Sequence, residues 1–130
     1  MTMPRATVRS YRDLLVWQRS LDIALRIYDA TAPFPRSELY GLVAQMRRAA
    51  VSIPSNIAEG HGRHHLGEYL HHLSIANGSL MELETQVIVS SRRRYLSEKE
   101  VRALLASCAE VGRMLAGLTR ALSRGRAASG

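Results

Sequence analysis

The sequence predicts an all-α protein built as an antiparallel up-down four-helix bundle. Apolar residues recur at steps of three and four along four stretches of the 130-residue chain, and no stretch shows the alternation typical of a strand. Turn-forming and capping residues separate the stretches, and short connectors place successive helices side by side and antiparallel. We expect one domain over residues 11–123, with a flexible N-terminal arm at 1–10 and a disordered tail at 124–130.

The first helix is expected over residues 11–32, where apolar side chains form one stripe. Pro33 and Pro35 end it, because neither donates a backbone hydrogen bond and each biases the preceding residue away from helix. Ser37 then offers its hydroxyl as the N-cap of the second helix, and Glu38 suits the positive end of the helix dipole.

The second helix is expected to continue to Gly60 and Gly62, which are typical C-terminal stops. Pro54 lies inside it, removes the hydrogen bond to the carbonyl of Ala50 and is expected to kink the helix. Nearby polar side chains could satisfy the freed backbone groups. The candidates are Ser52, Ser55 and Asn56.

The third and fourth helices show the most regular pattern, a heptad that indicates helices packed nearly parallel to each other. The fourth begins with a capping box, in which Ser97 is followed three residues later by Glu100. Cys108 lies on its apolar seam and is expected to be a small buried hydrophobe. The seam residues are Leu66, Tyr69, Leu73, Ala76, Leu80, Leu83 and Val87, then Val101, Leu104, Cys108, Val111, Leu115, Leu118 and Leu122.

A polar stripe accompanies the apolar one on the second helix, and polar residues at the same spacing occur on the third. Two explanations stay open: a face exposed to solvent, or a polar network buried between helices or subunits. In a network, Arg48 would pair with Glu82, and Asn56 with a backbone group. The residues that we assign to structure or assembly are Arg48, Ser52, Asn56, Glu59 and Glu82.

Several ordered sequence blocks resemble one bacterial four-helix-bundle family, the 23S rRNA intervening-sequence proteins, also labelled S23 ribosomal proteins. The strongest is VSIPSNIAEG at 51–60, and the resemblance extends over about residues 11–96. His64, His65, His71 and His72 depart from the family, which more often has Arg or other residues there. Further blocks include DLLVWQ at 13–18, ELYGL at 38–42, QMRRAA at 45–50 and ELET at 82–85.

This resemblance implies a bundle that assembles as a homopentamer and is linked to RNA or to reverse-transcriptase systems. Some members are encoded within insertions in large-subunit rRNA genes. A related group, the accessory variability proteins of diversity-generating retroelements, binds a reverse transcriptase and nucleic acid. A reverse transcriptase is therefore one partner that the resemblance suggests.

The chain carries 18 Lys and Arg residues against 11 Asp and Glu, a formal charge of +7, and Lys99 is its single lysine. Arginine binds phosphate and carboxylate through a planar fork, so the excess favours an anionic partner. A GC-rich gene would also favour arginine, and both explanations stay open. One cysteine and no apolar run long enough to span a bilayer predict a cytoplasmic protein without a membrane partner.

Three arginine clusters occur in the chain. They lie at the N-terminus (Arg5, Arg9, Arg12), between the third and fourth helices (Arg92, Arg93, Arg94), and late in the chain (Arg113, Arg120, Arg124, Arg126). Arginine side chains can hold phosphates, and Tyr95 could stack on a base. Alternatively, these arginines complement a helix dipole and keep the surface soluble. The residues that we assign to nucleic-acid binding are Arg92, Arg93, Arg94, Arg113 and Arg120.

We therefore expect a non-enzymatic, oligomeric accessory protein that binds the RNA or DNA backbone with little sequence selectivity. The alternative is a scaffold that docks a partner protein such as a reverse transcriptase. His64, Glu68 and His72 share a helix face and could bind zinc, but an exposed histidine-rich surface without metal is the favoured interpretation. No residue pattern indicates an active site or a cofactor. The histidines near this turn are His61, His64, His65, His71 and His72.

Overall fold

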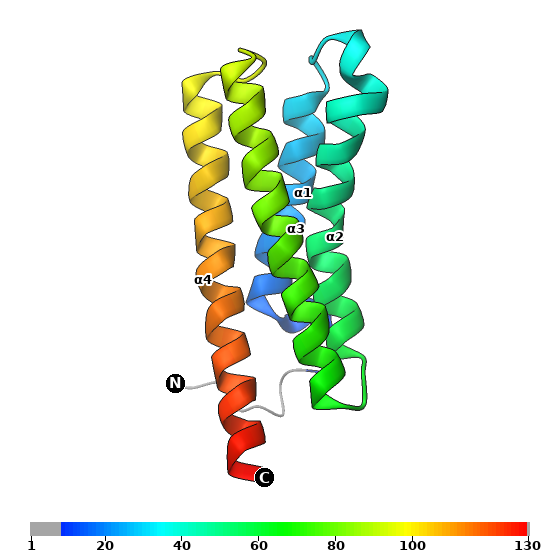
Figure 1. Ribbon diagram of the computed structural model, residues 1–130, viewed down its shortest axis with the longest axis vertical. Coiled ribbons are helices and arrows are strands. Elements are labelled where there is room, and N and C mark those ends of the chain that lie inside the picture. The colour runs from blue at the N-terminus through cyan, green and yellow to red at the C-terminus, as the bar shows by residue number, and fades with distance from the viewer. Residues whose placement is uncertain (1–8, 130) are drawn as a thin grey trace.

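The computed structural model describes residues 9–129, with side chains to residue 125, and contains four long helices (Figure 1). These are α1 (Leu15–Thr31), α2 (Ala44–His61), α3 (Leu66–Arg92) and α4 (Glu98–Ser129). Each helix packs against the one before it and runs in the opposite direction, and α1 also contacts α4. The predicted all-α, up-down bundle is confirmed, and the described residues include no strand.

The first helix begins later than the sequence predicts. A short 3-10 helix, η2 (Tyr11–Asp13), precedes it, and the extended backbone of Leu14 separates the two. Ser10 caps η2 by accepting a hydrogen bond from the Arg12 backbone N–H at 3.0 Å. Asp13 accepts hydrogen bonds from the backbone N–H groups of Arg9 (2.8 Å) and Ser10 (3.2 Å), which lower its pKa. Residues 1–8 of the predicted arm, including Arg5, lie outside the described residues.

Ser37 does not cap the second helix, so that prediction is wrong. It lies inside a 3-10 turn, η3 (Arg36–Glu38), which leads into a π-helical segment, η4 (Leu39–Val43). Gly41 within η4 has φ −108° and ψ −106°, far from helical values. A residue without Cβ tolerates such a backbone, and the regular helix starts only at Ala44.

The second helix continues through Pro54, which is buried, and Gly62 is its C-cap. The Asn56 amide donates to the Ser52 carbonyl at 2.8 Å, beside the proline. Gly60 lies one residue before the end of α2, at a close approach to α3. A Cβ at Gly60 would lie 2.8 Å from Cβ of His72 and 2.9 Å from Cδ1 of Tyr69.

The heptad seams of α3 and α4 form much of the core, as predicted. Leu80, Leu83 and Val87 of α3 are fully buried, and Leu104 and Cys108 of α4 are nearly so. The Ser97–Glu100 capping box is also confirmed, because each side chain accepts a hydrogen bond from the other residue's backbone N–H at 3.1 Å. In the described part of the chain, no helix combines the length and the hydrophobicity that a membrane span requires.

Candidate nucleic-acid interface

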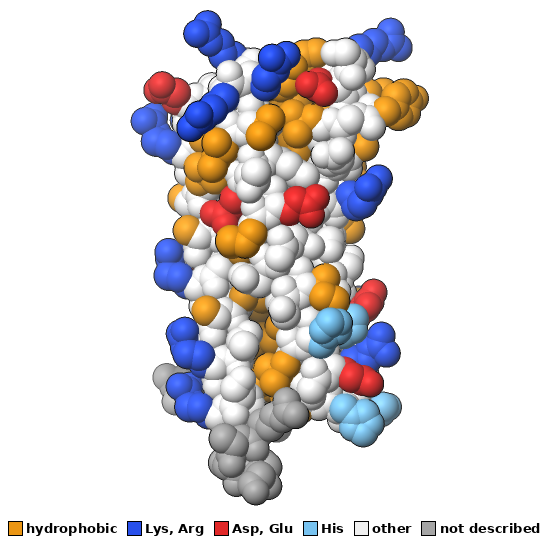
Figure 2. Space-filling model, in the orientation of Figure 1, with side chains coloured by type: hydrophobic (Ala, Val, Ile, Leu, Met, Phe, Trp, Pro, Cys, Tyr) orange, Lys and Arg blue, Asp and Glu red, His pale blue; other side chains and the backbone are white. Residues whose placement is uncertain are grey.

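The outer face of α4 carries a row of arginines, which we call the α4 basic stripe: Arg102, Arg113, Arg120 and Arg124. All four are exposed, and on an ideal helix they fall within an arc of about 40° and span about 33 Å. Figure 2 shows Lys and Arg side chains following one another down the left edge, which α4 forms in Figure 1. The stripe contains two of the predicted residues, Arg113 and Arg120.

The residues between these arginines are small and uncharged. Ala106, Ala109 and Ala116 occupy the same face and are exposed, and no acidic residue lies on this line between Arg102 and Arg124. Among the described residues, no carboxylate lies within ion-pair distance of the stripe. The guanidinium groups are therefore free to bind phosphate oxygens, and the alanines allow a polynucleotide backbone to approach the helix closely.

Arg92 is the last residue of α3, and Arg93 and Arg94 begin the turn to α4. The Tyr95 N–H donates to the Ser90 carbonyl at 2.8 Å, and the Arg94 N–H donates to the Ser91 carbonyl at 3.0 Å. This C-cap places Arg94 in the left-handed region, with φ 63°. The side chains of Arg92, Arg93 and Arg94 are exposed at the end of the bundle where α4 begins.

Arg93 differs from its two neighbours because it interacts with Tyr95. Its guanidinium lies 5.7 Å from the ring centroid and donates to the hydroxyl at 3.4 Å, which raises the Arg93 pKa. The hydroxyl donates to Glu38 at 3.0 Å, and the ring packs against Phe34 with centroids 5.2 Å apart. Tyr95 therefore fixes the turn, and its half-buried ring is engaged in the fold rather than presented to a base.

The predicted assembly residues divide into two groups. Ser52 and Asn56 join a network between α2 and α3, in which the Ser52 and Ser79 hydroxyls lie 2.8 Å apart. His72 Nδ1 extends it, 3.1 Å from Asn56 Oδ1 and 3.7 Å from Glu59 Oε2. Helical spacing makes His72 a candidate zinc ligand in the sequence and carries no signal of this contact with Asn56 and Glu59. Among the described residues, no group of three His, Cys, Asp or Glu side chains is placed to hold a metal.

The expected Arg48–Glu82 pair does not form. Glu82 instead accepts a hydrogen bond from the Gln86 amide at 3.3 Å, and Arg48 is exposed. Arg48 instead lines a hollow on the outer face of α2, together with Tyr40 and Val51.

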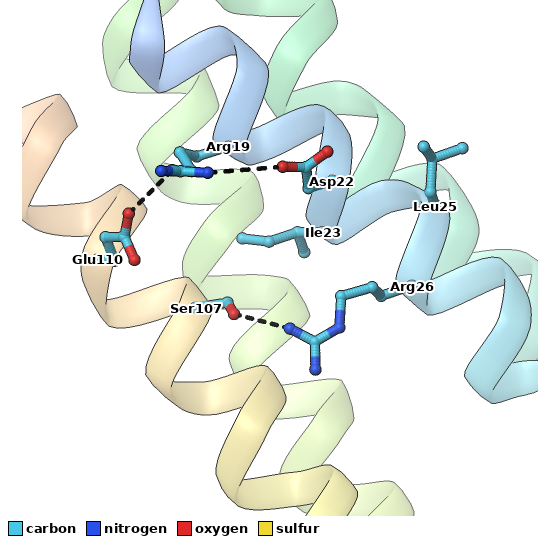
Figure 3. A pocket seen from close by; sticks show the side chains of 7 residues that line it. All are labelled: Arg19, Asp22, Ile23, Leu25, Arg26, Ser107 and Glu110. Atoms are coloured by element: carbon cyan, nitrogen blue, oxygen red, sulfur yellow. Dashed lines mark hydrogen bonds and ion pairs between the residues drawn. The ribbon is translucent and has the colours of Figure 1, made fainter.

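A different set of charges joins α4 to α1 (Figure 3). Arg19 lies between two carboxylates, 3.3 Å from Glu110 and 4.0 Å from Asp22, and Arg26 donates to the Ser107 hydroxyl at 3.0 Å. The two contacts between α1 and α4 have no local sequence signal, because each joins residues more than 80 positions apart. Glu110 is engaged with Arg19 in the α1–α4 groove, which leaves the α4 basic stripe as the free cationic face of that helix.

Comparison with known proteins agrees with this architecture. A crystal structure of a protein of unknown function from the S23 ribosomal protein family of Bacteroides thetaiotaomicron superposes with a TM-score of 0.75. It is 20% identical and covers 82% of this chain and 96% of its own, which shows a shared fold. Among proteins with curated annotation, none matches. The family model of 23S rRNA-intervening sequence proteins matches residues 12–117. Because the match spans most of the sequence, the chain belongs to the family of 23S rRNA-intervening sequence proteins.

Proposed function

We propose that this protein is a non-enzymatic, oligomeric nucleic-acid-binding protein that holds the phosphates of RNA or DNA with little sequence selectivity. The α4 basic stripe is the observation that carries the proposal, because its four exposed arginines share one face and, among the described residues, none of them forms an ion pair. Arg92 and Arg94 add charge where α4 begins. The family name, which refers to 23S rRNA, is consistent with RNA as the partner.

The test compares two double variants of equal charge. Arg113→Ala/Arg120→Ala removes the centre of the stripe, whereas Arg36→Ala/Arg63→Ala removes exposed arginines outside α4. We expect the stripe variant alone to weaken binding of a labelled RNA, and to flatten the dependence of log K on log salt by about 0.7 to 0.9 for each lost phosphate contact. Equal loss in the two variants would mean that binding follows net charge rather than the stripe.

The oligomer in this proposal is supported by two apolar surfaces. The outer face of α2 has a hollow of about 700 Å³ with exposed Tyr40 and Val51, and its lining includes Arg48 but no carboxylate. The outer face of α3 exposes Ile75, Met81, Ile88 and Val89 and carries Glu82. Surfaces of opposite charge on different faces suit head-to-tail contacts, which close into a ring when the rotation from one chain to the next is a whole fraction of a turn. The pentamer implied by the sequence resemblance is such a ring.

Light scattering at micromolar concentration tests this assembly. We expect the native protein to have several times the 14.5 kDa mass of one chain. Val51→Arg should produce the single chain, because it puts a large charged side chain into apolar surface that the contact would bury, while the same change at exposed Ala121 should leave the mass unchanged. A native protein that is monomeric would overturn the oligomer.

A docking scaffold for another protein, such as a reverse transcriptase, is the second candidate. The exposed apolar side chains of α3 favour it, because in this alternative they bind the partner protein instead of a second copy of the chain. The two candidates respond differently to the stripe variant, which would weaken nucleic-acid binding and leave capture of a protein partner on α3 intact.

A further inference from the structure

We propose that the α4 basic stripe binds single strands, and that one base of the strand enters a hollow between α3 and α4 beside Arg120. This inference rests on the proposed function and specifies the class of nucleic acid. The hollow has a volume of about 360 Å³, and Arg120 belongs both to its lining and to the stripe. A phosphate on Arg120 therefore places the adjoining nucleoside near the opening.

The floor of this hollow is apolar. Leu73 and Leu115 form it and are almost fully buried, with 1% and 2% of their surface exposed, and Leu70 adds a half-buried wall. In Figure 2, hydrophobic side chains show through the seam between α4 and α3 in the lower half of the molecule. An apolar surface of this kind suits the flat face of a nucleobase, which gains stability by leaving water.

The rim of the hollow is polar and uncharged apart from Arg120. Asn77 carries both a carbonyl oxygen and an amino group, and such an amide can pair with the donor and acceptor atoms on the edge of a base. Ser74 and Thr119 add hydroxyls that donate or accept. No carboxylate lines the hollow, so nothing in it repels a neighbouring phosphate.

The occupant is a base from a single strand because the bases of a duplex are paired and stacked inside the double helix. Turning a base outward breaks its pairing and stacking in a duplex, and it costs least in a strand that is already single. Ala116 lies on the rim and on the same face as the stripe arginines, so its small side chain leaves the entrance open from the phosphate side.

A pair of matched variants tests the hollow. Ala116→Leu blocks the entrance with a larger side chain, and leucine still favours the helix. Ala109→Leu makes the same change two turns earlier on the same exposed face, away from the hollow. The probes are a labelled single-stranded RNA, its duplex, and an abasic strand with the same number of phosphates. Fluorescence anisotropy at fixed salt measures their affinities.

We expect the single strand to bind about tenfold more tightly than the abasic strand, which corresponds to stacking of one base. Ala116→Leu should abolish this advantage and Ala109→Leu should keep it. Equal affinity for the base-containing and abasic strands, or equal effects of the two variants, would overturn the base-binding inference. A free nucleoside monophosphate that binds as tightly as the strand would overturn the assignment to a strand.

The two proposals fail in different ways. If Arg113→Ala/Arg120→Ala leaves binding of every probe unchanged, the proposed function itself is wrong. If that variant weakens all probes equally while Ala116→Leu has no effect, the stripe binds phosphates and the hollow binds no base. If Ala116→Leu instead disrupts only capture of a protein partner, the hollow is a protein-docking site and the inference is wrong.

Discussion

Arg94 occupies a backbone position that normally belongs to glycine. Its φ of 63° closes the C-terminal turn of α3, and in this region the Cβ of any larger residue is crowded by the backbone. The side chain is exposed, and it forms no hydrogen bond or ion pair with another of the described residues. An arginine at a strained position suggests that its charge is useful there.

Replacing Arg94 with glycine should therefore raise the free energy of unfolding by about 1 kcal/mol, because the strain disappears. The same change at Arg92, inside the last turn of α3, should lower it by about 1 kcal/mol. Urea unfolding measures both. RNA affinity should fall in both variants, so Arg94→Gly would be more stable and bind less well. A less stable Arg94→Gly variant would contradict this account.

At the scale of elements, the contact between α2 and α3 depends on Gly60. The two helices approach so closely there that a methyl group would meet Cβ of His72 and the Tyr69 ring at less than 3 Å. These atoms belong to helical residues whose backbone is held by the neighbouring turns, so they have little room to move aside.

Gly60→Ala should lower the free energy of unfolding by roughly 1 to 3 kcal/mol, because the helices must separate or the side chains must leave their rotamers. Gly78→Ala is the matched control within α3, where no atom lies within 4 Å of an added Cβ. It should raise the free energy of unfolding by about 1 kcal/mol through helix propensity alone. Thermal or urea unfolding of the two variants would distinguish close packing from helix propensity. A change of the same sign in the free energy of unfolding of both variants would refute the close packing at Gly60.

A feature of the helices can be predicted from the sequence when the residues that determine it lie close together in the chain. The heptads of α3 and α4 and the Ser97–Glu100 box were predicted because each depends on residues a few positions apart. Ser37 was assigned wrongly because the irregular backbone at Gly41 delays the helix to Ala44. Periodicity alone could have extended the Arg113–Arg120 pair to Arg102 and Arg124, since these continue the same helical spacing.

At the scale of the whole molecule, the core excludes water from the thiol of Cys108. The side chain is 1% exposed between the apolar residues of the bundle, and burial raises its pKa to about 12. In the unfolded chain the thiol ionises near its ordinary pKa. The folded state therefore favours the protonated thiol. The contribution of this preference to the free energy of unfolding is fully present below the pKa of the thiol in the unfolded chain, and it is lost as pH rises towards 12.

We expect the free energy of unfolding of the native protein to fall between pH 9 and 11 more steeply than that of Cys108→Ala. The alanine variant should start less stable, because it leaves a small cavity, but it lacks the thiol titration. Urea unfolding at several pH values gives both slopes. Parallel slopes would show that the thiol does not titrate differently in the folded and unfolded chain.

The sequence by itself determined the fold class, most of the core, the cap of α4 and the family, because these depend on local periodicity and ordered motifs. Only the tertiary structure decided the Ser52–Ser79 contact between α2 and α3, the place of Arg48 in the hollow on the outer face of α2, and the Arg19–Glu110 contact between α1 and α4. It also formed the hollow beside Arg120 from two helices. The physical reason is that helical periodicity gives the face on which a residue lies, whereas packing decides which residue stands opposite.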